Sequence, residues 1–305
     1  MLRALRPIRG LSVGPAAVRR VLVANVVVQV AIVVTGGVVR LTGSGLGCTT
    51  APECTPGRVT PFADAHVSIH RAIEFGNRML TTIVAVVALA TLVVVWRSAR
   101  RSLRALAAAP LALTLVQAVL GAITVRTGLN PGTVMAHFLV SMVLVAASTV
   151  LLHRFGEGDA EPRPLVRREL TLLTRAAAVL LGTVLVVGTV VTGTGPHSGD
   201  ADNPPRFSLD LRLVSWLHSD LVLLFVGLLV ALLVGLRLVD APARARRAAL
   251  VLAGLTAGQG VIGYTQYFTG LPSVLVGLHM LGASLLVVAM TWCLLSLRER
   301  VVAQS

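Results

Sequence analysis

The feature that most constrains this chain is a series of eight long apolar runs. They fall near residues 21–39, 69–96, 106–125, 132–152, 176–194, 211–236, 248–267 and 272–297. Most of them approach the ~20 residues that a helix needs to cross a bilayer. Because lipid cannot satisfy backbone hydrogen bonds, each run must satisfy its own, as an α-helix does. The sequence therefore predicts an all-α integral membrane protein with eight transmembrane helices.

The positions of the basic residues predict how these helices are oriented across the membrane. The formal net charge is +14, a value that also suits nucleic-acid binding, but every basic residue is an arginine and nearly all lie between apolar runs. The arginines cluster before the first run and after the second, fourth, sixth and eighth, which puts every cluster on one side of the membrane. By the positive-inside rule both termini are expected in the cytoplasm, with no nucleic-acid partner. The basic amino-terminal segment lacks a cleavage pattern, so we expect an uncleaved first helix.

A long segment of the chain occurs twice. Residues 117–142 recur at 259–284 with a constant shift of 142. Each copy is predicted to form a helix, a short turn and a second helix that contains a histidine. Both halves start on the same side, so the duplication predicts two parallel four-helix bundles related by a pseudo-twofold axis along the membrane normal. We assign residues 1–152 to the amino-terminal half, 153–175 to a cytoplasmic linker and 176–305 to the carboxy-terminal half. The matched pairs include Gln117 and Gln259, Gly121 and Gly263, Gly128 and Gly270, and His137 and His279.

Three histidines lie inside apolar runs, about 10 Å deep from the outer face at 1.5 Å per residue. These are His137, His218 and His279. An ionisable side chain within the membrane indicates a functional site, although a lone histidine hydrogen-bonded inside a bundle is the alternative. Two imidazoles facing across the second bundle, from His218 and His279, are a common way to hold a haem iron at both axial positions. Zinc or copper is disfavoured because it needs a third or fourth donor, and Asp220 is the only further carboxylate within the apolar runs of that half.

The first half differs from the second at one of these positions. A shift of 141 places Asn77, a poor iron ligand, where the second half has His218. His153 and His197 flank charged or outer segments, and we expect them to be solvated surface residues.

One face of the second run combines several polar residues. His70, Glu74 and Asn77 follow one another at helical spacing, and His66 lies one turn further out. A carboxylate at this depth is costly unless it is paired or solvated. Two interpretations of Glu74 remain open: a structural bridge to Arg71 or Arg78, or a proton-handling group in a cavity.

Two cysteines lie in the first outer loop, within the segment GCTTAPEC. Cys48 and Cys54 are candidates for a disulfide because that face of the membrane is oxidising. A structural staple and a thiol-exchange role both remain open. A zinc site is disfavoured because no second pair accompanies them, and Cys293 is expected to be buried in the last helix.

Several segments together resemble the haem A synthase family. They are GGVVRLTGSGLGC, the cysteine-bearing loop, IEFGNR, QAVLGAITVRTGLNP with AHF, and GLH in the last run, so the resemblance covers nearly the whole chain. It implies a membrane oxidoreductase that converts the carbon-8 methyl of haem o to the formyl group of haem a by successive hydroxylations, for cytochrome oxidase biogenesis. It also implies a haem b cofactor on His218 and His279, and a catalytic role for Glu74.

The resemblance further implies a substrate haem in the first half, near His137, Asn77 and His70. Many members of the family have a histidine where this chain has Asn77, which leaves His137 as the one strong protein ligand, with a weaker ligand, water or a displaced His70 opposite. We expect a haem o synthase to supply haem o, and a quinol or another donor to supply electrons. Whether the protein forms homo-oligomers is left open by the sequence. Outer arginines that suit haem propionates are Arg71, Arg78, Arg126, Arg206 and Arg212.

Two other classes of protein share these features. One is a di-haem, cytochrome b-like electron-transfer protein that leaves porphyrin unmodified, and the other is a small transporter built from parallel repeats. A di-haem electron-transfer protein would be expected to have two matched haem sites, which the unlike halves do not provide. An ion-coupled transporter favours charged residues at mid-membrane, which the apolar runs lack.

Overall fold

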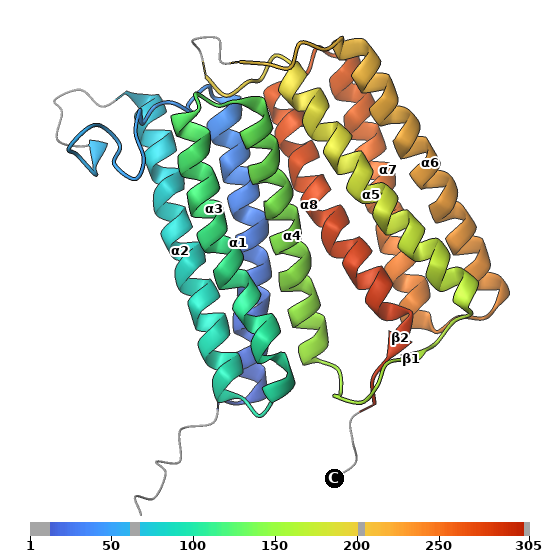
Figure 1. Cartoon of the computed structure of the whole chain (residues 1–305). Coiled ribbons are helices and arrows are strands. Elements are labelled where there is room, and N and C mark those ends of the chain that lie inside the picture. The colour runs from blue at the N-terminus through green and yellow to red at the C-terminus, as the bar shows by residue number, and fades with distance from the viewer. Residues whose placement is uncertain (1–12, 62–67, 201–204, 302–305) are drawn as a thin grey trace, which may run out of the picture.

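The computed structural model describes residues 13–61, 68–200 and 205–301, and within them it contains eight long helices (Figure 1). All eight are long and apolar enough to cross a membrane. The predicted all-α, eight-span fold is confirmed. The helices are α1 (Pro15–Leu41), α2 (Ile69–Arg97), α3 (Arg104–Arg126), α4 (Pro131–Phe155), α5 (Arg168–Thr194), α6 (Leu211–Leu238), α7 (Ala243–Phe268) and α8 (Ser273–Ser296).

Local sequence signals fix where several helices begin. Three of the helices have a capping side chain that accepts a hydrogen bond from the first turn, at Ser68, Asn130 and Asp210. Proline occupies the first turn of α1 and α4, where its missing N–H costs nothing. These signals let the helices extend past the apolar runs that predicted them.

The predicted linker is shorter than the sequence suggested. Residues 153–155 complete α4 and residues 168–175 begin α5, so only residues 156–167 connect the halves. This connection contains β1 (Arg163–Pro164), which pairs antiparallel with β2 (Arg298–Glu299) just after α8. The backbone N–H of Leu165 also donates to the carbonyl of Leu297 at 2.9 Å. The segment that directly follows α8 is therefore paired with the connection between the halves.

The helices form two groups of four that meet along α4 and α8 (Figure 1). In the first group α1 packs on α2 and α4, and α3 packs on α2 and α4. In the second, α5 packs on α6, and α7 packs on α6 and α8. Between the groups, α4 contacts α8 and α5, and α1 contacts α8. Exchanging α1 with α5 and α4 with α8 interchanges the α1–α8 and α4–α5 contacts.

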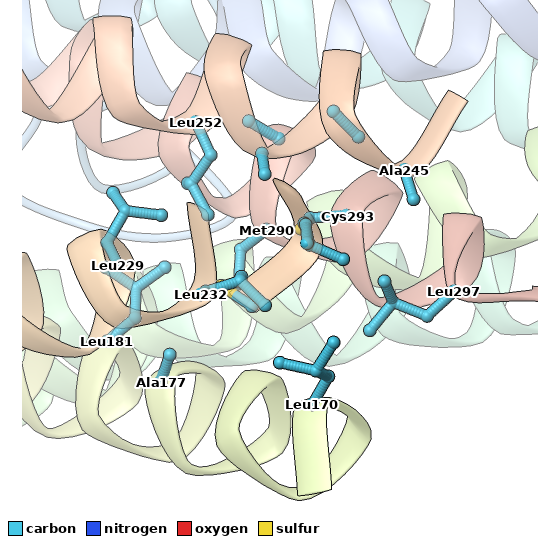
Figure 2. Packing of buried hydrophobic residues seen from close by; sticks show 14 of the residues in the cluster. Leu170, Ala177, Leu181, Leu229, Leu232, Ala245, Leu252, Met290, Cys293 and Leu297 are labelled. Carbon is cyan, nitrogen blue, oxygen red and sulfur yellow. The ribbon is translucent and has the colours of Figure 1, made fainter. Parts of the chain in front are cut away.

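The apolar cores lie at one end of each bundle. In the second half the core joins the start of α5, the end of α6, the start of α7 and the end of α8. In the first half a smaller cluster around Leu22, Leu103 and Leu151 occupies the equivalent end. Both cores are on the side of the arginine-rich turns, so the three histidines lie in the opposite halves of the bundles. Figure 2 shows the larger core, including Leu170, Ala177, Leu181, Leu229, Leu232, Ala245, Leu252, Met290, Cys293 and Leu297.

The duplicated turns share an unusual backbone. Leu129 and Leu271 have φ values of 60° and 59°, and each follows a glycine that also has a positive φ, Gly128 or Gly270. A leucine rarely adopts this left-handed conformation because its Cβ is crowded there. The repeat in the sequence thus corresponds to a repeated loop geometry between α3 and α4 and between α7 and α8.

Candidate functional site

Each of the three intramembrane histidines lies against a glycine on the neighbouring helix. A Cβ added at that glycine would come nearest to Cε1 of the imidazole, in a tight contact at Gly188 and in ordinary van der Waals contact at Gly263 and Gly121. The distances from such a Cβ to Cε1 are 3.0 Å for Gly188 and His218, 3.4 Å for Gly263 and His279, and 3.5 Å for Gly121 and His137. The three rings thus have closely similar cradles, one in the first half and two in the second.

The same histidines share an unsatisfied ring nitrogen. Nδ1 of His137, His218 and His279 is buried and has no hydrogen-bond partner among the described residues. Leaving a buried polar atom unpaired costs about 1–3 kcal/mol, so such atoms usually indicate a missing partner. Imidazole donors in this arrangement fit a haem-type group, whose iron takes histidine ligands.

A glutamine supports the histidine-bearing turn in each half. Nε2 of Gln117 donates to the backbone carbonyl of His137 at 2.9 Å, and Nε2 of Gln259 donates to the carbonyl of His279 at the same distance. In the first half Gln117 also bonds Oγ of Ser141 at 2.5 Å. The first residue of the duplicated segment therefore holds the helix that carries the histidine.

Glu74 is buried and connects α2 to the first outer loop. Its side chain forms an ion pair with Arg78 at 2.5 Å, and Oε2 accepts a hydrogen bond from the Cys48 N–H at 2.6 Å. Arg78 in turn donates from Nη1 to the carbonyls of Thr50, at 2.8 Å, and Glu53, at 3.1 Å. Of the two partners considered for a bridge, the structure pairs Glu74 with Arg78.

The loop held by this pair contains a disulfide. Cys48 and Cys54 are bonded to each other, as predicted, and both are fully buried beside Phe75. Cys293 is a free thiol in the core of the second half, also as expected. The disulfide and the Glu74–Arg78 pair together make the loop a closed unit against the outer end of α2.

The first half presents no second histidine at the depth of His137 among the described residues. Asn77 is half-buried, and its Oδ1 is buried without a partner there. His70 is exposed, with Nδ1 3.0 Å from Oγ of Ser44, and it is about 10 Å from Asn77 along the helix axis. His66 lies outside the described residues.

The outer arginines have contacts at the outer ends of the helices. Arg71 is partly buried in the first turn of α2, and the partners of the other four are specific groups. The partners are the disulfide loop for Arg78, the Ala51 carbonyl for Arg126 at 2.9 Å, the Pro196 carbonyl for Arg206 at 3.2 Å, and the Trp216 ring for Arg212, with its guanidinium carbon 4.6 Å from the centroid.

Sequence reasoning missed a connection between the two halves on this face. Arg40, at the end of α1, donates to the carbonyls of His197 at 2.5 Å and Thr192 at 2.7 Å. Nε2 of His197 lies 2.8 Å from the Leu271 carbonyl, so the expectation of a solvated His197 is not met. His153, also expected at the surface, is partly exposed and faces Glu157 at 3.3 Å. The sequence signal for this connection is Arg40, a single arginine at the end of the first apolar run.

Comparison with known proteins indicates the family of this chain. Residues 19–197, more than half of the chain, match the family model COX15-CtaA, described as cytochrome oxidase assembly protein. A "Heme A synthase" of Bacillus pumilus (strain SAFR-032) is 30% identical over 154 residues, which is 50% of this chain and 49% of the relative. A "Heme A synthase" of Listeria welshimeri is 29% identical over 139 residues, 45% of each chain. The chain spans about half the length of the curated relatives it matches.

The family match and the eight spans agree with each other. The bacterial relatives and the helices indicate a multi-pass protein of the bacterial cell membrane. The matched region contains α1 to α5 and therefore His137, Glu74 and the disulfide loop. On this basis the chain belongs to the COX15-CtaA family of cytochrome oxidase assembly proteins.

Proposed function

We propose that this protein is a haem A synthase, which oxidises the carbon-8 methyl of haem o to the formyl group of haem a for cytochrome oxidase assembly. The observation that supports it most is the set of three cradled histidines with unpartnered Nδ1 atoms. The named relatives and the family match support the same reaction. The unlike halves favour one substrate site and one cofactor site over the two matched sites of an electron conduit.

In this proposal the second half holds a resident haem b. His218 and His279 would ligate its iron from α6 and α8, and Gly188 and Gly263 leave room for the rings. Each imidazole would offer one ring nitrogen to the iron. The bound haem would supply electrons one at a time, and the protein's part is to fix the two imidazoles.

The first half would bind haem o as substrate. His137 is the proposed ligand from α4, and Gln117 fixes the turn that carries it. Asn77, which stands where the second half has His218, offers only an amide, so the second face of the substrate iron lacks a strong ligand. Arg71, which follows His70 in the first turn of α2, is a proposed propionate contact.

Glu74 has two proposed tasks that experiment can separate. As an acid it would deliver protons during oxidation of the methyl group. As a partner of Arg78 and Cys48 it positions the disulfide loop at the outer end of the first half. For a proton role Oε2 is the suitable oxygen, because it accepts one hydrogen bond, from Cys48, whereas Oε1 accepts two from Arg78.

Porphyrin analysis after expression tests the proposal. The full chain is produced in a host that makes haem o but has no haem A synthase of its own, and the porphyrins are extracted and identified by mass. We expect haem a or its hydroxylated precursor with the unsubstituted chain and neither with His137→Ala. Haem b should remain in His137→Ala and disappear with His279→Ala. Bound haem without any oxidised product from the unsubstituted chain would instead favour a di-haem electron-transfer protein.

A further inference from the structure

A pocket outside the candidate haem sites lies between the end of α6 and the start of α7. Its volume is about 390 Å³, and it is on the side of the arginine-rich turns. Its walls combine apolar residues that continue onto the lipid-facing surface with guanidinium groups. The lining residues are Leu233, Leu236, Ala243 and Leu250, together with Arg237, Arg246 and Arg247.

The three arginines of this pocket lack a counter-charge. They are exposed, and within the described part of the chain none of them has a hydrogen bond or ion pair through its side chain. Asp240, in the same turn, forms no ion pair with them there. Arg246 and Arg247 also lie near the amino end of α7, where the helix dipole disfavours cations, and Pro242 provides no side-chain cap. An anion in the pocket would relieve both problems.

The duplication supplies an internal comparison. With the shift of 142, Arg246 corresponds to Arg104, and the shift of 141 that pairs α2 with α6 places Trp96 where the second half has Arg237. In the first half the Arg104 guanidinium carbon stacks 5.0 Å from the centroid of the Trp96 ring, and Nη2 donates to the Trp96 carbonyl at 3.1 Å. The second half has thus replaced an aromatic partner by another cation.

The alignment of the two helices is exact enough to support this comparison. Ala107 of α3 and Ala249 of α7, related by the same shift, are both fully buried. Thr114 and Thr256 each bond the carbonyl four residues earlier, at 2.7 and 2.8 Å. In α2 and α6 the shift of 141 likewise pairs buried Ala88 with buried Leu229 and buried Val95 with buried Leu236. Trp96 and Arg237 therefore occupy equivalent places and differ in side chain.

We propose that this pocket binds the phosphate of an anionic phospholipid from the adjoining leaflet. Guanidinium groups match phosphate oxygens in pairs, and basic pockets between helices at this depth suit lipid headgroups. Leu233 and Leu250 would contact the start of an acyl chain, which continues along the exposed apolar surface of Val230, Val234 and Val251. A free inorganic anion would gain nothing from these walls. The inference does not depend on the proposed oxidation of haem o.

Lipid binding to the purified full chain tests the proposal. The protein is delipidated in neutral detergent and titrated with short-chain phosphatidylglycerol, short-chain phosphatidylcholine or inorganic phosphate, and bound lipid is counted by native mass spectrometry. Arg237→Gln, Arg246→Gln and Arg247→Gln are compared singly and together, with Arg104→Gln as the matched control. The thermal midpoint without lipid shows whether each variant is folded. If the triple variant is not folded, the lipid affinities of the three single variants test the proposal.

We expect phosphatidylglycerol to bind more tightly than phosphatidylcholine. Each single variant should weaken its binding about fivefold, which equals about 1 kcal/mol per arginine, and the triple variant about a hundredfold. Arg104→Gln should leave the affinity within about twofold. The proposal is overturned if the triple variant binds phosphatidylglycerol as the unsubstituted chain does, or if phosphatidylcholine binds equally well. Full competition by inorganic phosphate would also overturn it, since the site would then be a free-anion site.

Discussion

Replacing Glu74 by glutamine should loosen the disulfide loop. The carboxylate accepts from Arg78 on one side and from the Cys48 N–H on the other. Glutamine has one oxygen and one NH₂ group, so whichever way it turns, the NH₂ faces a donor. Hydrogen bonds to charged groups contribute about 1.5–3 kcal/mol each. Arg78 keeps its carbonyl partners at Thr50 and Glu53, which limits the loss, and we estimate about 2–4 kcal/mol for loop attachment.

Reduction of the disulfide measures this loss. Cys48 and Cys54 are fully buried, so a water-soluble reductant must wait for the loop to open. A change of 2–4 kcal/mol corresponds to reduction about 30-fold to about 900-fold faster in Glu74→Gln, followed by mass-tagging of the freed thiols. Glu53→Gln is the matched control, because the Glu53 side chain bonds the Gly57 N–H within the same loop, at 2.8 Å, and does not tie the loop to α2 among the described residues. It should change the rate by less than about threefold.

The result also assigns Glu74 its task. If Glu74→Gln is reduced at the unsubstituted rate, the carboxylate does not anchor the loop and the reasoning above fails. Haem o conversion measured on the same protein then separates the proposals. Lost conversion with a closed loop indicates a proton role, whereas lost conversion together with a loosened loop indicates positioning.

Three further changes test other parts of the structure. Gly188→Ala should lower the haem bound per protein, because the new Cβ would lie 3.0 Å from the His218 ring. Gly182→Ala on the same helix is the control, since no atom lies within 4 Å of its new Cβ, and it should leave the haem content unchanged. Equal haem content in both variants would refute the role of Gly188. Gln259→Leu should lower the thermal midpoint by the equivalent of about 1 kcal/mol or more, because the His279 carbonyl loses its donor, and an unchanged midpoint would show that the bond is replaceable. The Ser102 hydroxyl, assisted by Arg100, holds the pKa of Asp159 below its usual value of 3.8, so its stabilising effect is present above that pH and is lost as the pH falls through the lower, folded-state pKa. Asp159→Asn should therefore show a smaller drop in thermal midpoint between about pH 6 and about pH 3 than the unsubstituted chain, and equal drops would contradict this linkage.

The fold could be predicted from the sequence because its determinants are long and periodic. Eight apolar runs, separated by arginines and turn residues, leave few alternatives to a helical membrane protein. The disulfide followed from two nearby cysteines in an outer loop, and the three histidines were conspicuous because they interrupt apolar helices. The turns after Gly128 and Gly270 were found because they occur twice.

The details of the outer face could not be predicted for a physical reason. Arg40, Arg78 and His197 bond backbone carbonyls of distant loops, and a carbonyl has no residue identity in the sequence. The choice between a proton-handling Glu74 and a bridge depended on where the Cys48 N–H lies, which no helical spacing encodes. The strands β1 and β2 contain two residues each, too few for a periodic signal.

The central place of α8 has a consequence for the order of assembly during translation. This helix is synthesised after the other seven that the structure describes, yet it contacts α1 and α4 of the first bundle as well as its own. At about 5–20 residues per second, the roughly 140 residues that follow α4 take about 7–30 s to be made. For that time α1 and α4 present to lipid, or to an insertion factor, a seam including Val33, Met142 and Val145 that Val287 later covers. Truncation before α8 should therefore leave the first bundle inserted but with an open flank, a natural point for quality-control proteases to act.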